Sequence, residues 1–405
     1  MNSPSSVVPN LADWPILLLR DVTTILRRGT APVYADASDV RAIGQRCITN
    51  TDFASGYARP HSSRAMTNVL VPQQDDVLVN STGTGTIGRS VIFRERTGQY
   101  IVDGHVTVAR PSPAVIAPRW LNDILRSPWG QRYLESRCYA GSTNQIELSS
   151  GALADFPLAT PSLPEQRRIA EILDTLDDQI RATERIIAKL GLAKQGTAHN
   201  LLDEQPWFEV PLAEVSEVRN GTTPSRARRD YWDGGTVPWL ASGKVNEYVV
   251  KHASELVTTR AVSDCGLRIL PPGSIIIGMI GEGKTRGMSA RLDLSAAINQ
   301  NLAGVIPGKD LDGGFLHHYL VHSYQRLRGG GRGSNQDALN TKLVSDFLVP
   351  LPPLERQHNI ARTLDALDRR ASEEALAIAK LRLLKEGLMS DLLTGRIRVP
   401  METAS

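Results

Sequence analysis

The chain has 405 residues, 41% of them hydrophobic and 22% charged, and its formal net charge is +3 at neutral pH. This length exceeds the roughly 100 to 200 residues of a single domain and predicts at least two. The globular composition, the lack of a long apolar run and an N-terminus without a secretory-signal pattern exclude membrane and secreted classes, so we expect a cytoplasmic protein.

The first 160 residues, called head 1 below, alternate short apolar runs with turn residues. Apolar runs at 76–79, 90–93 and 101–102 predict β-strands, and the pattern near 120–136 predicts a helix. Mixed short strands and few helices are typical of a compact α+β domain. We therefore expect head 1 to be a recognition domain of that class.

A glycine-rich segment lies between the first two of these strands. Gly83–Gly88 matches the G-x-G-x-x-G pattern of dinucleotide sites, and Asp103 follows about 20 residues later. Such a site needs a helix directly after the glycines, because the helix N-terminus binds the pyrophosphate. Residues 89–93 instead have the β-branched and aromatic character of a strand, which favours a turn over a nucleotide site.

Residues 161–204 predict a long helix. Pro164 and Glu165 suit its first turn, and Gly196 indicates a late break. Apolar residues recur at alternating spacings of four and three, which predicts a coiled-coil seam formed by Ile169, Leu173, Leu176, Ile180, Ile187 and Leu190. A helix of roughly 25 to 40 residues is about 40 to 60 Å long and would carry the chain well away from head 1.

Residues 205–350, called head 2 below, have the same mixed character, with a strand predicted at 274–277 and a helix near 314–328. The segment 278–285 formally matches the P-loop pattern G-x-x-x-x-G-K-[ST]. Gly287 would break the helix that a P-loop needs, no apolar run ending in a metal-binding Asp follows, and head 1 lacks the Gly-Lys-Thr sequence. We interpret both glycine-rich segments as turns that let backbone and basic side chains approach DNA.

Residues 351–396 predict a second long helix, followed by a tail at 397–405. This helix repeats the first at an offset of 191 residues, with 17 identities in the 40 positions from Leu163 and from Leu354. Its seam is formed by Ile360, Leu364, Leu367, Ile378, Leu381 and Leu388, and Gly387 indicates a late break. Shared Gly-Thr-x-Pro segments at Gly29 and Gly221 extend the duplication into the heads.

The duplication predicts two tandem α+β heads, each followed by a long helix. If the helices pair antiparallel as a coiled coil, a pseudo-two-fold axis relates the heads and places them at opposite ends of a rod, at least one turn of DNA apart, roughly 34 Å. Parallel pairing would bring the heads together. Helices that only hold a dimer together are the alternative, but they would not explain why both heads are duplicated. We favour the antiparallel arrangement.

Other chemistry is sparse. Three widely spaced cysteines predict neither a disulfide framework nor a metal site, and no adenine-methyltransferase Asn/Asp-Pro-Pro-aromatic segment is present. His318 and His322 are spaced i, i+4, but no third ligand is evident, so we expect a surface pair and no metal. Tyr231, Trp232 and Trp239 could stack on bases, although core positions are the more frequent use of such residues.

Together these features resemble the specificity subunits of Type I restriction-modification systems. The resemblance spans nearly the whole chain and rests on the duplication and on the segments 161–166, 231–239, 281–287 and 299–302. It implies two target recognition domains, each reading one half of a bipartite double-stranded DNA target, and helices that set the spacing and bind two modification subunits. It also implies a chain without a catalytic site, with S-adenosylmethionine, ATP and Mg²⁺ used by the modification and restriction subunits. Arg356 departs from the acidic-Gln pattern at the start of the second helix.

We expect DNA contacts from basic and amide side chains in the predicted loops. Arginine suits phosphate and guanine, and the amides of Asn and Gln suit adenine. The candidates in head 1 are Arg28, Thr84, Arg89, Arg137, Asn144 and Gln145. The candidates in head 2 are Arg226, Lys244, Lys284, Arg286, Arg332, Asn335 and Gln336. Ordinary solvated side chains are the alternative for each.

Three other functions remain open at this point. A P-loop NTPase would bind nucleotide, a self-sufficient DNA-modifying enzyme would act on DNA alone, and a coiled-coil adaptor would show no sequence preference for DNA.

Overall fold

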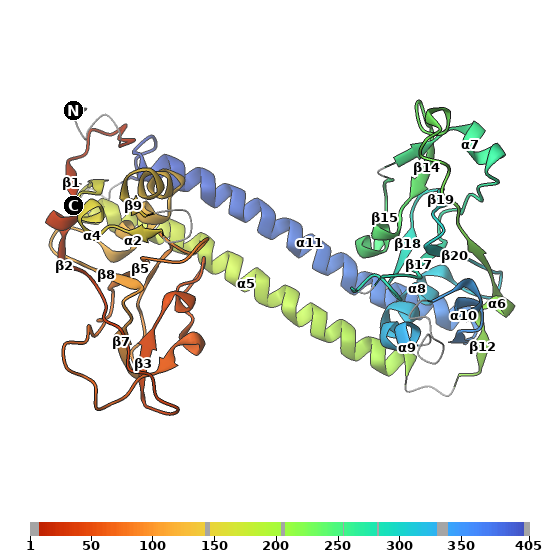
Figure 1. Ribbon diagram of the computed structural model, residues 1–405, viewed down its shortest axis with the longest axis horizontal. Helices are drawn as coiled ribbons and strands as arrows, with labels where there is room; N and C mark the ends of the chain where they lie inside the picture. Colours follow the sequence, from red (N-terminus) through yellow and green to blue (C-terminus); the bar gives the residue numbers. More distant parts are fainter. Residues whose placement is uncertain are drawn as a thin grey trace. The chain divides into compact units, whose positions relative to one another are not determined.

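The computed structural model of the chain describes residues 8–141, 146–203, 207–253, 255–281, 283–329 and 339–400. Contacts divide the chain into two compact units (Figure 1). Unit 1 comprises Met1–Ala182 and Ala377–Ser405, and unit 2 comprises Thr183–Leu376. This division falls within the two long helices, because each half of a helix packs with a head. None of the helices among the described residues has the length and apolarity needed to cross a membrane.

Unit 1 contains head 1 and is built around two sheets. The larger sheet is antiparallel with the order β2-β8-β5-β6, and the smaller has the order β4-β3-β7 with β3 parallel to β7. Its strands are β1 (Ile16–Leu18), β2 (Thr23–Arg28), β3 (Val40–Ile43), β4 (Arg59–Pro60), β5 (Val77–Asn80), β6 (Ser90–Ile92), β7 (Gln99–Val102), β8 (Val106–Pro111), β9 (Tyr139–Ala140), β10 (Glu147–Leu148) and β11 (Pro157–Ala159). Its short helices are α1 (Leu19–Val22), α2 (Pro118–Arg126), α3 (Pro128–Tyr133) and α4 (Ser150–Ala154), with a π-helical turn at Leu134–Cys138.

Unit 2 contains head 2 and repeats this plan. Its larger sheet has the order β13-β20-β17-β18-β15 and its smaller sheet the order β16-β14-β19. Its strands are β12 (Glu209–Pro211), β13 (Ser216–Asn220), β14 (Val237–Leu240), β15 (Val249–Val250), β16 (Glu255–Val257), β17 (Ile275–Gly278), β18 (Ser289–Leu292), β19 (Ala297–Ile298), β20 (Leu302–Pro307) and β21 (Leu348–Pro350). Its short helices are α6 (Leu212–Val215), α7 (Thr259–Asp264), α8 (Gly313–His322), α9 (Tyr324–Gly329) and α10 (Thr341–Ser345).

The two heads share one topology. Strands β2-β8-β5-β6 correspond to β13-β20-β17-β18, and β14 pairs in parallel with β19 as β3 does with β7. A strand pair at the ends of each head, β1 with β11 and β12 with β21, completes the match. The strands and short helices predicted from the sequence are all present, so the α+β class of both heads is confirmed.

The shared Gly-Thr-x-Pro segment has a steric explanation. A Cβ atom on Gly29 would lie 2.0 Å from the carbonyl oxygen of Val102, and one on Gly221 would lie 2.2 Å from that of Ile298. Both distances are far below van der Waals contact. Only glycine therefore lets the chain pass this closely over the end of β7 in head 1 and of β19 in head 2.

The long helices are α5 (Leu163–Leu202) and α11 (Leu354–Leu393). Pro164 is the second residue of α5, where a missing backbone N–H costs nothing. The breaks predicted at Gly196 and Gly387 are wrong, because both helices continue through these residues. A glycine costs only about 1 kcal/mol in a helix interior, and burial of Ala198 and Leu202 just beyond Gly196 offsets that cost.

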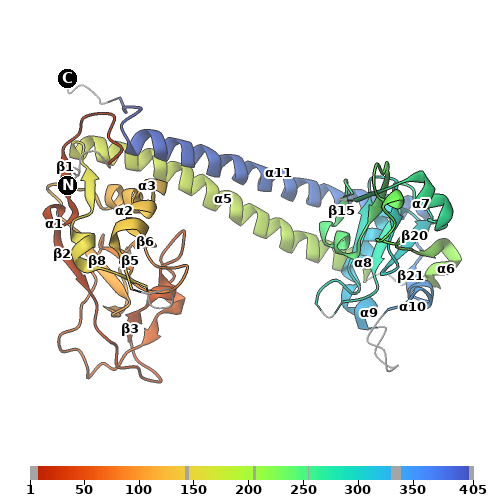
Figure 2. The ribbon, with the colours of Figure 1, turned by 45° about the horizontal axis from the view of Figure 1, so that its top comes forward.

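Within each unit the halves of α5 and α11 lie side by side and run antiparallel (Figures 1 and 2). In unit 1, Asp177 pairs with Lys385 at 2.5 Å, and Glu165, at the start of α5, pairs with Arg398, which follows α11. In unit 2, Lys194 pairs with Asp368 at 2.6 Å. The residues of the Lys194–Asp368 pair are equivalent to Lys385 and Asp177 at the offset of 191. Antiparallel pairing is thus confirmed in both units, and each unit contains one copy of the same interhelix ion pair.

The predicted seam lies at these helix contacts. All twelve seam residues are buried or half-buried, whereas Leu192, Leu376 and Leu383, which are outside the predicted seam, are 69%, 58% and 69% exposed. The first two seam residues of each helix also pack into the core of the adjoining head. The seam therefore attaches each helix to its head as well as to the other helix.

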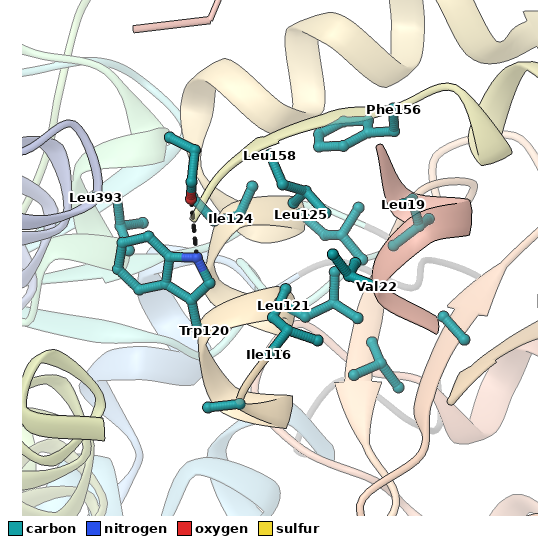
Figure 3. Close-up of a cluster of buried hydrophobic side chains, with 14 of the residues drawn as sticks. Leu19, Val22, Ile116, Trp120, Leu121, Ile124, Leu125, Phe156, Leu158 and Leu393 are labelled. Carbon is teal, nitrogen blue, oxygen red and sulfur yellow. Dashed lines mark hydrogen bonds between the residues drawn. The ribbon is translucent and has the colours of Figure 1, made fainter. Parts of the chain in front are cut away.

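The core of unit 1 shows this attachment directly. Leu121, Ile124 and Leu125 of α2 pack with Leu19, Phe156 and Leu158 of the head and with Leu393 near the end of α11 (Figure 3). The indole N–H of Trp120 donates to the carbonyl oxygen of Ala159 at 3.1 Å. Six consecutive residues from Trp120 are buried, because one face of α2 meets the sheet and another meets the long helices. In unit 2, α8 is buried in the same way from Phe315 to Leu320.

A buried glutamine joins the first turn of each long helix to its head. The Gln166 side chain accepts from the backbone N–H of Ala117 and donates to the carbonyls of Val115 and Pro161. Gln357, which is equivalent at the offset of 191, makes the same three kinds of bond with Asp312, Asp310 and Pro352. The neighbouring Arg356 is exposed, while its equivalent Glu165 is buried and paired with Arg398. In the acidic-Gln pattern, the glutamine thus fixes the long helix to its head in both copies. The preceding residue differs between the copies, being Glu165 in α5 and Arg356 in α11.

We expect Gln166→Leu to lower the free energy of unfolding by about 2 to 4 kcal/mol, because leucine cannot make the three hydrogen bonds of Gln166 to backbone groups, two of which are buried. Urea denaturation followed by circular dichroism would measure the loss. Gln195→Leu, at an exposed position of α5, is the matched control and should change stability by less than about 0.5 kcal/mol. Equal effects of the two variants would contradict the role assigned to Gln166.

Candidate nucleic-acid interface

The glycine-rich segment of head 1 is a hairpin turn between the antiparallel strands β5 and β6. Gly83, Gly85 and Gly88 have φ values of +99°, +78° and +80°, which favour glycine. The backbone N–H of Gly88 donates to the carbonyl of Asn80 at 2.9 Å and closes the turn. A strand follows the turn, so the arrangement of a dinucleotide site is absent here, as predicted.

The P-loop-like segment of head 2 is the equivalent turn, between β17 and β18. The backbone N–H of Gly287 donates to the carbonyl of Gly278 at 2.8 Å, and Gly287 has a φ of +83°. Strand β18 begins at Ser289, where a P-loop would continue as a helix. The described part of the segment therefore presents no helix N-terminus to a phosphate, which removes the structural basis for an NTPase.

Side chains of the following helices hold both turns in place. In head 1, the Gln131 amide donates to the carbonyl of Gly88 at 3.0 Å. In head 2, the Tyr324 hydroxyl donates to the carbonyl of Lys284 at 3.0 Å, and the Arg328 guanidinium donates to that of Arg286 at 3.1 Å. These hydrogen bonds thus hold each turn in a defined position on its head.

A surface hollow lies beside each turn. Hollow 1 has a volume of about 230 Å³ and is lined by Thr49, Asn50, Arg89, Ser90, Arg126 and Gln131. Hollow 2 has a volume of about 570 Å³ and is lined by Val245, Asn246, Tyr248, Lys284, Gly287, Met288, Ser289, Val321, Tyr324 and Gln325. The hairpin turn, the sheet and the helices that follow the sheet bound both hollows. They are therefore equivalent features of the duplicated heads.

Four of the predicted residues lie at these turns. Thr84 is exposed at the tip of the first turn, and the Arg89 guanidinium donates to the carbonyl of Gly85 at 2.6 Å. Lys284 is exposed on the rim of hollow 2. Arg286 is half-buried, and its Nε has no hydrogen-bond partner among the described residues. Basic side chains beside a hollow with hydrogen-bonding groups suit contact with phosphates and base edges.

Other predicted residues are engaged within the heads. Arg28 pairs with Glu147 at 2.9 Å and donates to the carbonyl of Ser81 at 3.1 Å. Lys244 pairs with Glu247 at 2.5 Å, with its side chain only 15% exposed. Contact of either residue with DNA would require it to leave an acidic partner. Arg137 is exposed on the π-helical turn.

Arg226 is held by both a carboxylate and aromatic rings. Its guanidinium makes a two-point contact with Glu255, at 2.6 and 3.1 Å, and lies 3.7 Å from the centre of the Trp232 ring. Tyr231 and Trp239 are buried, as expected for core residues, while Trp232 is half-buried. Asn144, Gln145, Arg332, Asn335 and Gln336 lie outside the described residues, so their predicted contacts stay predictions.

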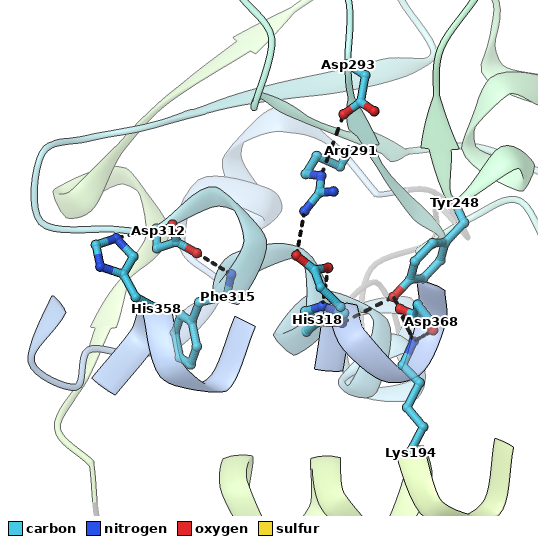
Figure 4. A network of polar contacts seen from close by, with 10 residues as sticks. Lys194, Tyr248, Arg291, Asp293, Asp312, Phe315, His318, His358 and Asp368 are labelled. Atoms are coloured by element: carbon cyan, nitrogen blue, oxygen red, sulfur yellow. Dashed lines mark hydrogen bonds and ion pairs between the residues drawn. The ribbon is translucent and has the colours of Figure 1, made fainter. Parts of the chain in front are cut away.

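The expected surface pair of His318 and His322 is wrong for His318. His318 is buried, and its Nε2 lies 2.9 Å from a carboxylate oxygen of Asp365 on α11, whose other oxygen lies 3.4 Å from the Arg291 guanidinium (Figure 4). The hydrogen bond from His318 and the charge of Arg291 lower the pKa of Asp365 to about 2. Spacing along the helix could not show this, because the carboxylate belongs to a distant segment.

The same network connects Tyr248, Asp368 and Lys194. The Tyr248 hydroxyl donates to Asp368 at 2.8 Å, and the Lys194 ammonium lies 2.6 and 2.7 Å from the two oxygens of that carboxylate (Figure 4). His317 lies against the Tyr248 ring, and burial lowers its pKa to about 3. The network joins α5, α8 and α11 within unit 2.

Several residues at the hollows were not predicted from the sequence. Arg126, Gln131 and Asn50 line hollow 1, and Asn246 and Tyr324 line hollow 2. They come from segments roughly 40 residues away from the turns, so no local motif includes them.

A larger cavity of about 620 Å³ beside α2 and α5 contains none of the predicted DNA contacts. The three cysteines form no disulfide in the described residues.

Comparisons with known proteins agree with this architecture. Over 96% of this chain and 94% of the relative, the sequence is 24% identical to a type I restriction enzyme MjaX specificity subunit of Methanocaldococcus jannaschii. It is also 24% identical to the type I restriction enzyme EcoR124I/EcoR124II specificity subunit of Escherichia coli, over 58% of this chain and 61% of the relative.

Two solved structures share the fold. The S subunit of a Type I restriction-modification system from M. genitalium matches with a TM-score of 0.62 and 13% identity, covering 97% of this chain and 98% of that one. A chain from a study of assembly and conformational transition in the type I R-M system matches with a TM-score of 0.60 and 18% identity, covering 95% and 98%. The sequence model of the Type I restriction modification DNA specificity domain matches twice, at residues 13–192 and 204–380. The chain therefore belongs to the Type I restriction modification DNA specificity domain family and carries two copies of that domain.

Proposed function

We propose that this chain is the DNA specificity subunit of a Type I restriction-modification complex. Each head reads one half of a bipartite double-stranded DNA target, and the long helices set the spacing between the half-sites. The observation that carries the proposal is the duplication: two family domains share one topology, each with a hairpin turn that side chains hold beside a hollow. A protein that recognises two separate DNA half-sites needs two such surfaces, whereas a coiled-coil adaptor does not.

In this proposal the chain binds DNA and leaves the chemistry to its partners. Two modification subunits dock on the helices and methylate adenine with S-adenosylmethionine, and restriction subunits use ATP and Mg²⁺. The complex acts in the cytoplasm. The hairpin in place of a P-loop supports a chain without ATPase activity, and the absence of a methyltransferase segment from the sequence supports one without methylation activity.

Mapping of methylated adenines across the genome, with and without the gene, tests the function. We expect an interrupted target motif to lose methylation when the gene is deleted and to regain it when the gene is restored. The purified chain alone should neither methylate nor cleave DNA. An unchanged methylation map would contradict the specificity role, methylation by the isolated chain would indicate an enzyme, and a complex without sequence preference would indicate an adaptor.

A further inference from the structure

Three potential metal ligands converge in unit 2 where α5 ends. His199 and Asp203 are four residues apart, in and just beyond the last turn of α5, and His322 is the last residue of α8. One carboxylate oxygen of Asp203 lies 2.9 Å from His199 Nδ1 and 2.7 Å from His322 Nε2. The three ligand atoms all lie within 4.8 Å of one another. Residues more than 100 positions apart thus present two imidazole nitrogens and one oxygen to a common point.

This set of atoms matches the chemistry of a transition-metal ion. Zn²⁺ binds imidazole nitrogen and carboxylate oxygen at about 2.0 to 2.2 Å and adopts tetrahedral geometry, which a water molecule would complete. The separations between the ligand atoms require only small side-chain movements to surround an ion at such distances. The carboxyl end of a helix also carries partial negative charge from its unpaired carbonyls, which favours a cation. Mg²⁺ prefers an all-oxygen, octahedral set and fits poorly.

The equivalent location in unit 1 shows that the fold does not require this cluster. At the offset of 191, His199 and Asp203 correspond to Ser390 and Thr394. When Trp120 of α2 is aligned with Phe315 of α8, which are the first residues of their buried runs, His322 corresponds to Ser127. Ser127, Ser390 and Thr394 line one small cavity in unit 1. The same junction of helices therefore exists in both units, and only unit 2 places three metal-binding side chains there.

A second group of potential metal ligands in unit 2 differs from this one, because protein cations already pair with its carboxylates. His318, Asp365 and Asp368 also lie close together, but the Lys194 ammonium contacts both oxygens of Asp368, and Arg291 contacts Asp365. Protein cations already neutralise those carboxylates. Around His199, Asp203 and His322 the side chains are partly exposed, at 61%, 43% and 25%, so an ion can reach them from solvent.

We propose that His199, Asp203 and His322 bind one divalent transition-metal ion, with Zn²⁺ the expected occupant. The ion links the last turn of α5 to α8 and so reinforces the attachment of this helix end to head 2 within unit 2. The expectation of no metal rested on the lack of an evident third ligand beside His318 and His322. The structure instead separates these two histidines into different clusters and supplies the other ligands of His322 from α5.

The test is titration of the untagged full-length chain, after treatment with EDTA, with ZnCl₂ in a calorimeter. We expect one equivalent to bind, and the thermal unfolding temperature to rise with added Zn²⁺. Co²⁺ should give visible absorption bands characteristic of nitrogen and oxygen ligands. The double variant His199→Ala, His322→Ala should lose at least about 100-fold in affinity and lose the Co²⁺ bands, since loss of even outer-shell partners costs 10- to 100-fold.

Two controls keep this test decisive. His252→Ala removes an exposed histidine outside the cluster and should bind Zn²⁺ as the unchanged chain does, and MgCl₂ should give no binding heat at the site. Absence of stoichiometric Zn²⁺ binding by the unchanged chain, or equal affinity in the double variant, would overturn the proposal. Because the experiment needs neither DNA nor partner subunits, its failure would leave the proposed DNA specificity untouched.

Discussion

In the assembled complex, the double variant Lys284→Ala, Arg286→Ala is expected to lose recognition of the half-site read by head 2. Lys284 is exposed on the rim of hollow 2, and Arg286 lies in the same turn. A specific basic contact with a base or phosphate is worth about 1 to 3 kcal/mol, so loss of two contacts predicts a fall in affinity on the order of 100-fold. Methylation of duplexes that carry both half-sites, or either one alone with the other replaced, would measure this loss.

Matched variants assign the effect to one head. Arg89→Ala changes the equivalent turn of head 1 and should reduce discrimination at the other half-site only. Lys342→Ala removes an exposed ammonium on α10 that does not line hollow 2 and should leave methylation unchanged. Lys284→Ala alone guards against distortion of the turn, because only its backbone carbonyl is held by Tyr324. Unchanged methylation at both half-sites in the double variant would remove this turn from the interface.

The architecture could be predicted from the sequence because its signals are local or repeated. The heptad spacing of the two seams predicted long paired helices, and the offset of 191 residues predicted two heads of one topology. The strands on either side of Gly83–Gly88, and the strand before the P-loop-like segment, were visible as β-branched runs. Comparison of the two copies then separated hairpin turns from nucleotide sites, since a real P-loop would have needed a helix in place of β18.

The site could be predicted only in part, because its other residues come from distant segments. Glycine-rich turns identified Thr84, Arg89, Lys284 and Arg286, but nothing near them in the sequence indicated Arg126 or Tyr324. The acidic residues that pair with the predicted DNA-binding cations could not be predicted from the sequence either. Glu255 engages Arg226, and Glu147 engages Arg28, across separations that no helical or strand periodicity spans. Predicted contacts based on residue type alone therefore included cations already paired within the heads.

The two copies also differ in how they neutralise equivalent carboxylates. Asp174 and Asp177 on α5 are equivalent to Asp365 and Asp368 on α11. In unit 1, Arg119 of α2 contacts both α5 carboxylates, at 3.2 and 2.6 Å. In unit 2, His318, Arg291, Tyr248 and Lys194 share that role. Duplication preserved the acidic positions and the lysine that contacts the second of them, Lys385 in unit 1 and Lys194 in unit 2. The other partners changed, so they could not be predicted from the repeat.

In unit 1 the single side chain of Arg119 contacts both α5 carboxylates, so Arg119→Ala is expected to destabilise this unit strongly. Arg119 is only 13% exposed and also pairs with Asp123 of α2 at 2.9 Å, whose side chain is 3% exposed. Removal of one partner from a buried ion pair typically costs about 3 to 5 kcal/mol, because a charge is left buried without compensation. Lys385 still contacts Asp177, so Asp123 should account for most of the loss. Urea denaturation followed by circular dichroism would measure it.

The loss of stability in Arg119→Ala should also depend on pH, and the pKa of the Asp123 carboxyl determines the direction of that dependence. Burial raises the pKa of Asp123 from 3.8 to about 6, against the opposing charges of Arg119, Lys385 and Arg126. A carboxyl with a raised pKa binds more protons in the folded state, so its contribution to stability falls as pH rises from about 4 to about 6. Without Arg119 the pKa rises further and this window extends upward. The variant should therefore lose more stability at about pH 8 than at about pH 5.

A surface ion pair provides the comparison for this prediction. Arg168→Ala removes a side chain that is 57% exposed and paired with the exposed Glu171 on α5. Exposed pairs contribute at most about 1 kcal/mol, so this variant should be nearly neutral and insensitive to pH between about 5 and 8. A loss in Arg119→Ala that matched the Arg168→Ala control, or that shrank as pH rose, would show that Asp123 is not the charge Arg119 compensates. A large loss that grows as pH rises would identify Arg119 as the cation that compensates Asp123 and joins α2 to α5 through Asp174 and Asp177.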